Sequence, residues 1–192
     1  MKAQAWKGEM VLGLIAYLFV GLMFLASRAC AQNWVEEQTY VNQGVVTPRI
    51  DGLFTKTVSK QWGSFAWLQV QQIYSQGYAG ATYSPKPCLQ FALGAGLEQD
   101  KHPARIGSYV YLCKGPVSGL TVFEGGGSGF WYKVETNYQA THRIGIGTLS
   151  ERYRGHGPKF EYSVPHTPIK LWFAPLIIHN SISPLFGLRW NL

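Results

Sequence analysis

The sequence has few cysteines, few charges and, after its first 31 residues, no apolar stretch that could cross a membrane as a helix. It contains 3 cysteines, and only 14% of its 192 residues are charged. The best later apolar segment, Leu171 to Ile178, is short and is broken by Pro175. After residue 31 there is also no helical period, no low-complexity tract and no long repeat. These absences exclude a multi-span helical membrane protein and a repeat array.

Motifs for several kinds of chemistry are missing as well. No His or Cys cluster has the spacing of metal ligands, and Gly125-Gly126-Gly127 lacks the strand-to-helix context of a phosphate-binding loop. The net charge of +7 is scattered and forms no basic run. We therefore expect no metal site, no cofactor and no nucleic-acid partner. The basic excess favours anionic partners such as lipid headgroups.

The N-terminus has the pattern of a secretory signal. Lys2 and Lys7 precede an uncharged stretch from Met10 to Ala26, and Ala29-Cys30-Ala31 gives a small-x-small cleavage motif. The sequence therefore predicts a cleaved signal peptide over residues 1–31. An uncleaved helical anchor and a lipid-modified Cys30 are the alternatives.

Glycine and aromatic residues are abundant: the chain has 22 Gly and is 15% aromatic. Residues 32–48 are polar and poorly patterned, which indicates a short N-terminal lead. From Arg49 to Leu192, segments of roughly 8–11 residues alternate with turns rich in Gly, Pro, Ser and Asn, and this is the length at which a tilted strand crosses a bilayer core. The sequence predicts an all-β protein, an antiparallel up-and-down transmembrane β-barrel over residues 49–192 with about ten strands, or eight.

The phase of the alternation decides which face of the barrel is apolar. In residues 130–139 the even positions read Phe, Tyr, Val, Thr and Tyr, and the odd positions read Trp, Lys, Glu, Asn and Gln. In residues 88–98 the face opposite Leu89, Phe91 and Leu93 is mostly Gly and Ala. Glycine has low strand propensity and would not dominate a solvated face, whereas small residues make room in a narrow lumen. We therefore expect the apolar face to point outward. A soluble lipocalin-like barrel would have the reverse phase.

A hairpin around Asp100-Lys101 gives a further prediction. Symmetric pairing sets Leu89 opposite Leu112 and places bulky tyrosines opposite small residues. The same register puts Cys88 opposite Cys113, at a separation that a disulfide can bridge. We expect a structural disulfide between Cys88 and Cys113; two buried free thiols are the alternative.

The last seven residues, Phe186-Gly187-Leu188-Arg189-Trp190-Asn191-Leu192, alternate apolar and other residues up to the final position. This stretch resembles the terminal strand of bacterial outer-membrane β-barrels, although Leu192 stands where Phe is usual. The resemblance implies an outer-membrane location, a periplasmic C-terminus and contact with the barrel-insertion machinery through Phe186, Leu188, Trp190 and Leu192. A periplasmic or secreted location is the alternative. Under this topology, loops 98–103, 125–129, 152–158 and 179–184 face the cell exterior.

Two groups of residues are candidates for a site. Arg152, Arg154 and His156, with Lys159 just beyond, form the most basic exterior loop and could bind lipopolysaccharide phosphates; an ordinary solvated turn is the other interpretation. His179 and Ser181, spaced i, i+2, resemble the His-x-Ser pair of the outer-membrane lipid A deacylases. Ile182 stands where that family has Asn, and no Glu lies in the final strand to orient the histidine; Glu151 is the substitute that the fold would have to bring near.

Three functions follow from these features. The first is a non-enzymatic outer-membrane barrel with a side-chain-filled lumen and a structural, lipid-interacting or partner-docking role, its partners being outer-membrane lipid and lipopolysaccharide. The inward-facing charges, among them Lys133, Glu135, Lys159 and Glu161, would then pair as a plug, or else line a selective channel. The second is a lipid A acyl-ester hydrolase that uses His179 and Ser181. The third is a secreted lipocalin-like binder of an apolar ligand.

Overall fold

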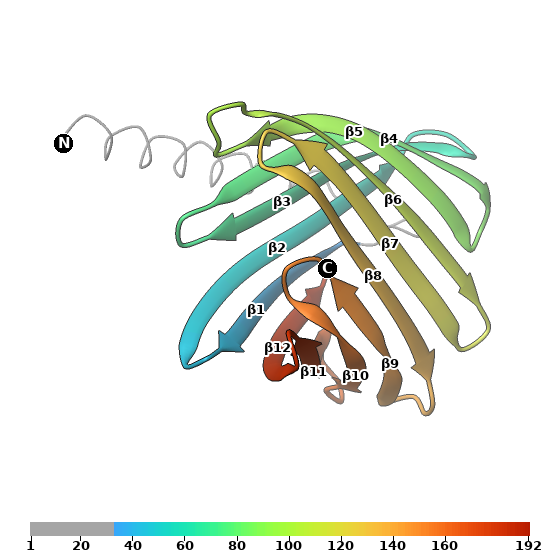
Figure 1. Ribbon diagram of the computed structural model, residues 1–192. Helices are drawn as coiled ribbons and strands as arrows, with labels where there is room; N and C mark the ends of the chain where they lie inside the picture. Colours follow the sequence, from blue (N-terminus) through green and yellow to red (C-terminus); the bar gives the residue numbers. More distant parts are fainter. Residues whose placement is uncertain (1–32) are drawn as a thin grey trace.

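The computed structural model describes residues 33–192, which form a closed β-barrel (Figure 1). Within these residues, no helix has the length and apolar character that crossing a membrane requires. The strands are β1 (Trp34–Asn42), β2 (Val45–Thr57), β3 (Trp62–Gln71), β4 (Ser75–Lys86), β5 (Leu89–Glu98), β6 (Ala104–Lys114), β7 (Val117–Gly126), β8 (Gly129–Gln139), β9 (Ile144–Glu151), β10 (Gly155–Ser163), β11 (Ile169–Ile178) and β12 (Ser181–Asn191). The predicted signal peptide, residues 1–31, lies outside the described residues.

The barrel has twelve strands, so the prediction of about ten, or eight, is wrong. Each strand pairs antiparallel with the next, and β1 pairs with β12 to close the sheet. Residues 32–48, which the sequence pattern indicates as a lead, contain β1. Its outward face includes Glu37 and Thr39 beside Val35 and Val41, so β1 lacks the clean apolar alternation that marks the other strands.

An even number of strands brings both ends of the barrel chain to one rim, where the backbone N–H of Leu192 donates to the carbonyl oxygen of Asn33 at 2.8 Å. We call this rim the terminal end; it also carries the β2–β3, β4–β5, β6–β7, β8–β9 and β10–β11 turns. The opposite rim, the loop end, carries the other six turns: β1–β2, β3–β4, β5–β6, β7–β8, β9–β10 and β11–β12. All the turns are short, so no large domain projects from either end within residues 33–192.

The apolar side chains point outward, as the sequence predicts. Leu93 is 64% exposed and Phe160 is 46% exposed, whereas Lys133 and Lys159 are each only 1% exposed. Burial of lysine together with exposure of leucine is the reverse of a soluble barrel. The lipocalin-like alternative needs Leu89, Phe91 and Leu93 inside, so the structure does not support it.

The β5–β6 hairpin has the predicted register. Leu89 pairs with Leu112, Ala92 with Tyr109 and Gly94 with Gly107. A disulfide joins Cys88 and Cys113 at the terminal end, with their Cα atoms 4.8 Å apart, so this prediction is also confirmed.

Candidate functional site: the barrel lumen

The interior of the barrel is lined with paired charges. Within residues 33–192, seven cationic side chains and seven carboxylates form ion pairs inside the barrel, so the lumen is formally neutral. The cations are Arg49, Arg105, Lys133, Arg154, Lys159, Lys170 and Arg189, and the carboxylates are Glu36, Asp51, Glu98, Glu124, Glu135, Glu151 and Glu161. They fall into three clusters.

The central cluster joins strands on opposite sides of the β1–β12 closure. Lys159 Nζ lies 2.5 Å from Glu135 Oε1 and 2.8 Å from Glu161 Oε1. Arg189 Nε donates to Glu36 Oε2 at 2.5 Å, and Lys133 Nζ lies 3.4 Å from Glu135 Oε2. These six residues come from β1, β8, β10 and β12, and each is placed inward by the alternation of its own strand.

Two tryptophans pack on the cations of the central cluster. The ring of Trp172 lies 4.5 Å from Lys159 Nζ, and its indole N–H donates to Glu36 Oε2 at 3.0 Å. The ring of Trp34 lies 4.7 Å from the guanidinium carbon of Arg189. Cation–π contacts and hydrogen bonds thus compensate the charges for their lost hydration.

The second cluster lies toward the loop end. Arg49 Nη1 lies 2.7 Å from Glu151 Oε1, and Arg49 Nε lies 3.0 Å from Asp51 Oδ2. Arg154, in the β9–β10 turn, lies 3.2 Å from Glu151. Burial and the neighbouring Arg49 guanidinium lower the pKa of Arg154. Gln38 accepts a hydrogen bond from Arg49 and donates to Asp51 and to Glu36, so it connects this cluster to the central one.

The third cluster surrounds Arg105 on the opposite wall. Arg105 Nη1 lies 2.7 Å from Glu98 Oε2, and Arg105 Nη2 lies 3.3 Å from Glu124 Oε2. The hydroxyl of Tyr74, in the β3–β4 turn, donates to Glu98 Oε2 at 2.6 Å. Burial raises the pKa of Tyr74, which keeps this hydroxyl protonated as the donor.

Aromatic side chains fill the wall beside the charges. Phe65 packs edge-on against Tyr109 at 5.3 Å between ring centroids, and Trp34 packs similarly on Trp67 at 5.5 Å. Small residues on other strands leave room for these rings. A Cβ at Gly94 would lie 2.8 Å from the Phe65 ring, closer than real Cβ contacts. The predicted crowded lumen, with bulky rings opposite small residues, is therefore what the structure contains.

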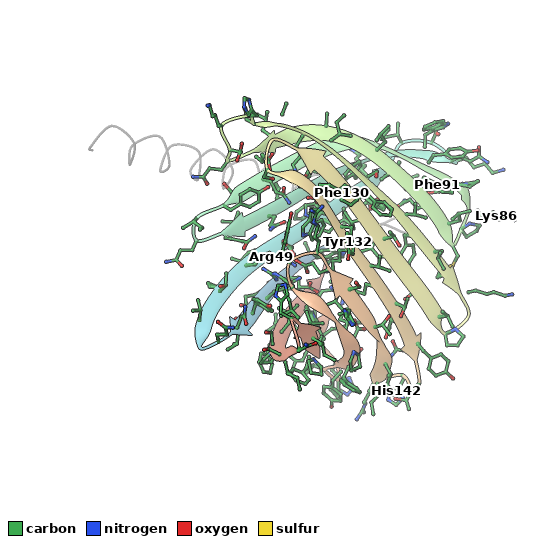
Figure 2. All side chains as sticks on the ribbon, viewed as in Figure 1. Arg49, Lys86, Phe91, Phe130, Tyr132 and His142 are labelled. Carbon is green, nitrogen blue, oxygen red and sulfur yellow. A yellow bond between two sulfur atoms is a disulfide. The ribbon has the colours of Figure 1, made fainter. Side chains whose placement is uncertain are left out.

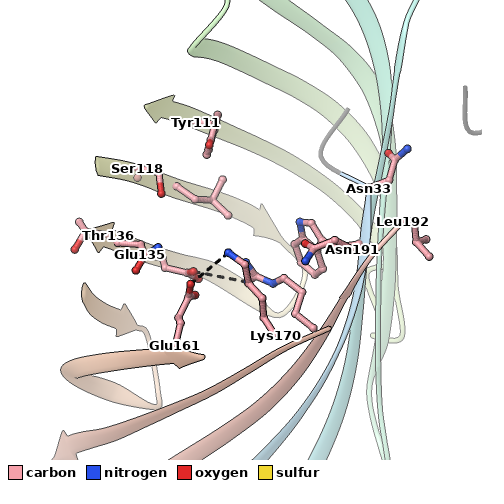
Figure 3. A pocket seen from close by; sticks show the side chains of 14 residues that line it. Asn33, Tyr111, Ser118, Glu135, Thr136, Glu161, Lys170, Asn191 and Leu192 are labelled. Atoms are coloured by element: carbon pink, nitrogen blue, oxygen red, sulfur yellow. Dashed lines mark ion pairs between the residues drawn. The ribbon is translucent and has the colours of Figure 1, made fainter. Parts of the chain in front are cut away.

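A cavity of about 300 Å³ lies at each end of the lumen. The terminal-end cavity is lined by residues of the central cluster, with Glu135, Glu161 and Lys170 converging on it (Figure 3). The loop-end cavity is lined by Arg49, Arg105, Arg152 and Arg154 together with Glu124, Glu151 and several glutamines and aromatics. The two cavities share no lining residue, and the buried central cluster and aromatic wall lie between them.

No family model and no curated protein matches the sequence. The structure, however, is similar to solved membrane barrels. The KdgM porin matches with a TM-score of 0.59 at 13% identity, over 83% of this chain and 99% of that one. The NanC porin matches with a TM-score of 0.51 at 11% identity, over 83% of this chain and all of that one. A chain from work on in-meso crystallization of membrane proteins gives 0.62 at 12% identity, over 84% and 83%.

The chain has the fold of a bacterial outer-membrane porin. The class-level resemblance predicted from the sequence is therefore confirmed.

On this porin fold the four basic residues predicted as a lipid or anion site do not come together. Arg152 lies at the rim, donating to the Phe130 carbonyl oxygen at 2.7 Å and covering the Tyr153 ring. His156 is exposed on the outer side. Arg154 and Lys159 are buried in the lumen and belong to two different charge clusters. Only Arg152 and His156 of this group are at the surface.

His179 and Ser181 lie at the loop end, both exposed. His179 and Asn180 form the β11–β12 turn, and both have a positive φ, 47° and 63°. Only Ser181 belongs to a strand, so the two residues do not lie on one strand face as the spacing indicates. Glu151 is buried and binds Arg49 and Arg154 rather than His179. Catalysis by His179 and Ser181 stays a prediction.

Much of the lumen network is absent from the sequence-based candidates. Glu36, Gln38, Arg49, Asp51 and Arg105 each carry part of it. The available signal was a period of two, in which inward residues alternate with outward ones. On β2 the inward residues are Arg49, Asp51 and Leu53, and on β3 they include Gln69 and Gln71. It is faint because a charge inside a barrel and a charge on a solvated face produce the same pattern.

Proposed function

We propose that this chain is an outer-membrane β-barrel whose lumen is closed, so that it acts through its membrane-facing and rim surfaces rather than as an open diffusion pore. The central cluster is the observation that carries this proposal. Its charges are buried, mutually paired and packed on Trp34 and Trp172 between two separate cavities. Opening the barrel would require breaking several buried ion pairs at once, each of which is strongly unfavourable to break singly.

The outer surface supports residence in a membrane. Its strands expose a continuous belt of apolar side chains, and near the terminal end the belt finishes in amphipathic aromatics: Trp62, Tyr83, Tyr138, Tyr162 and Trp190. Aromatic girdles of this kind sit at the level of lipid headgroups. The porin fold supports the outer membrane as the location, with the terminal end on the periplasmic side.

The terminal strand supports contact with the barrel-insertion machinery. Phe186, Leu188 and Trp190 point outward from β12, Leu192 follows directly after it, and all four are 41–53% exposed. They form one apolar row next to the β1–β12 pairing that closes the barrel, where the insertion machinery could bind them.

A second candidate function is passage of an anionic solute. Four arginines and two glutamates line the loop-end cavity, a local excess of positive charge. One solved structure with this fold is the KdgM porin in complex with disordered oligogalacturonate. The formally neutral lumen and the closed centre favour the first proposal.

Electrical recording from planar bilayers tests the two proposals together. We expect the purified full chain to give no steady conductance step, with or without oligogalacturonate in the chamber. A fourfold variant removes two ion pairs of the central cluster, Glu36–Arg189 and Lys159–Glu161, by changing all four residues to alanine. It should conduct, because both charges of each pair are removed together and water fills the space that they leave.

A steady conductance in the unchanged protein would overturn the closed-lumen proposal. If oligogalacturonate blocked that conductance, the second candidate function would replace it. A heat-modifiable band on an unboiled gel of the same preparation would establish in each case that the recorded protein is a folded barrel.

A further inference from the structure

Glu37 is a carboxylate on the membrane-facing side of the barrel. It lies on β1 between the inward residues Glu36 and Gln38 and is exposed, whereas those two are fully buried. Within residues 33–192, it is the one charged outward-facing strand residue that does not lie within two positions of a strand end. Its Oε1 accepts a hydrogen bond from the Thr39 hydroxyl at 2.7 Å, and Glu37 forms no ion pair with the described residues. A charge that faces lipid without an ion pair is costly, which makes Glu37 a candidate binding group.

An open apolar groove of about 630 Å³ begins at Glu37 and extends across β12, β11 and β10 to the start of β9. Its outward-facing lining is aromatic and aliphatic: Ile144, Phe160, Tyr162, Leu171, Phe173, Phe186 and Leu188. A single acidic group at one edge of a long apolar surface is the complement of a molecule with a cationic head and a hydrocarbon tail.

The depth of Glu37 in the membrane fits such a molecule. Glu37 pairs with Leu188, and Val35, two positions nearer the terminal end, pairs with Trp190 of the aromatic girdle. Two residues of strand correspond to about 7 Å. The carboxylate therefore lies just inside the headgroup level on the terminal side, within reach of a lipid headgroup that dips toward it.

We propose that Glu37 and this groove bind an ethanolamine phospholipid, with the ammonium group on the Glu37 carboxylate and an acyl chain along Phe160, Phe173 and Phe186. The site rests on the proposed function, because it needs the belt to face a bilayer. A second copy of the chain is a poorer occupant, since the middle of its outer belt offers no cation in residues 33–192 to meet Glu37. Choline phospholipid is a poorer ligand, because its trimethylated nitrogen donates no hydrogen bond.

Lipid exchange followed by native mass spectrometry tests the site. The full chain, folded in nanodiscs, is equilibrated with equal amounts of ethanolamine and choline phospholipids that have identical acyl chains, and the retained lipid is counted. We expect the unchanged protein to retain the ethanolamine lipid with a preference of about five- to tenfold, the order of the net contribution of one hydrogen bond. Glu37→Gln should reduce that preference to near one. Asp100→Asn, which neutralises an exposed acid in the β5–β6 loop, should keep it.

A second variant tests the groove independently of the charge. Leu171→Ser makes the groove more polar without touching Glu37, and we expect it to lower the total number of retained lipids while leaving the headgroup preference. Equal preference in the unchanged protein and in Glu37→Gln would overturn the site. Loss of the heat-modifiable barrel in membranes would instead overturn the proposed function, so the two failures are distinguishable.

Discussion

At the scale of single residues, the lumen concentrates most of the acidic groups of the chain in pairs. Lys159 is the clearest example, because it is 1% exposed and contacts two carboxylates and an indole ring. A buried ion pair adds little to stability compared with apolar packing, but removal of one partner leaves an uncompensated charge. The identity of each charge is therefore constrained by its neighbours.

Lys159→Ala should destabilise the barrel by about 3–5 kcal/mol, because Glu135 and Glu161 would then face each other without a cation between them. Denaturant titration of the micelle-bound protein, followed by the heat-modifiable gel band, measures the change. Lys86→Ala, at an exposed position of the terminal end (Figure 2), is the matched control and should stay within about 0.5 kcal/mol of the unchanged protein. Equal midpoints for both variants would show that the central cluster does not hold the barrel.

At the scale of strands, bulky inward side chains occupy space that glycine leaves on the neighbouring strand. Gly187 on β12 pairs with Trp172 on β11, and a Cβ at Gly187 would lie 2.2 Å from the Trp172 ring. That ring also covers Lys159 and donates to Glu36. The small residue on β12 therefore positions an aromatic that stabilises the central cluster.

Gly187→Ala should lower stability by about 1–3 kcal/mol, because the added methyl forces the Trp172 ring to move away from its two partners. Intrinsic fluorescence should report a changed tryptophan environment along with the lower unfolding midpoint. Gly125→Ala is the control, since a Cβ there meets nothing within 4 Å. If the two alanine variants behave alike, the tight fit at Gly187 is not important for stability.

At the scale of the whole molecule, the charges outside the lumen are distributed unevenly between the two ends. Every terminal-end turn from β2–β3 to β8–β9 has an exposed cation in it or beside it, and no acidic side chain lies in the terminal-end turns of residues 33–192. These turns follow one another along one margin of the barrel in Figure 1. The cations form a basic arc: Lys56, Lys60, Lys86, Lys114 and Arg143. The arc lies next to the aromatic girdle, where the proposed outer-membrane location would bring it to the lipid phosphates.

Replacing Lys60, Lys86 and Lys114 of the basic arc by Gln should weaken binding to vesicles that contain anionic phosphatidylglycerol, by about 1 kcal/mol for each lysine at low salt. Flotation of the refolding protein with vesicles of increasing phosphatidylglycerol content measures the effect, and added salt should reduce it. Lys101→Gln at the loop end is the control and should change little. A triple variant that floats as well as the unchanged protein at every composition would exclude an electrostatic role for the arc.

Local patterns in the sequence determined much of this fold. The alternation in residues 130–139 indicated which face is apolar, and the hairpin around Asp100 specified its own register and the Cys88–Cys113 disulfide. These features depend on neighbours in the chain and on the period of two. The strand number was beyond such reasoning, because β1 carries Glu37 and Thr39 on its outer face and loses its signal.

Only the tertiary structure decided which charges meet. Arg49 and Glu151 are about a hundred positions apart in sequence, as are Glu36 and Lys133, and closure of the barrel brings each pair together. The sequence predicted one basic loop that contains Arg154, with Lys159 just beyond. Arg154 lies in the β9–β10 turn and Lys159 lies well inside β10, so they belong to different clusters. A strand specifies which face a side chain lies on, whereas ring closure and strand stagger, which no local pattern encodes, specify what it touches.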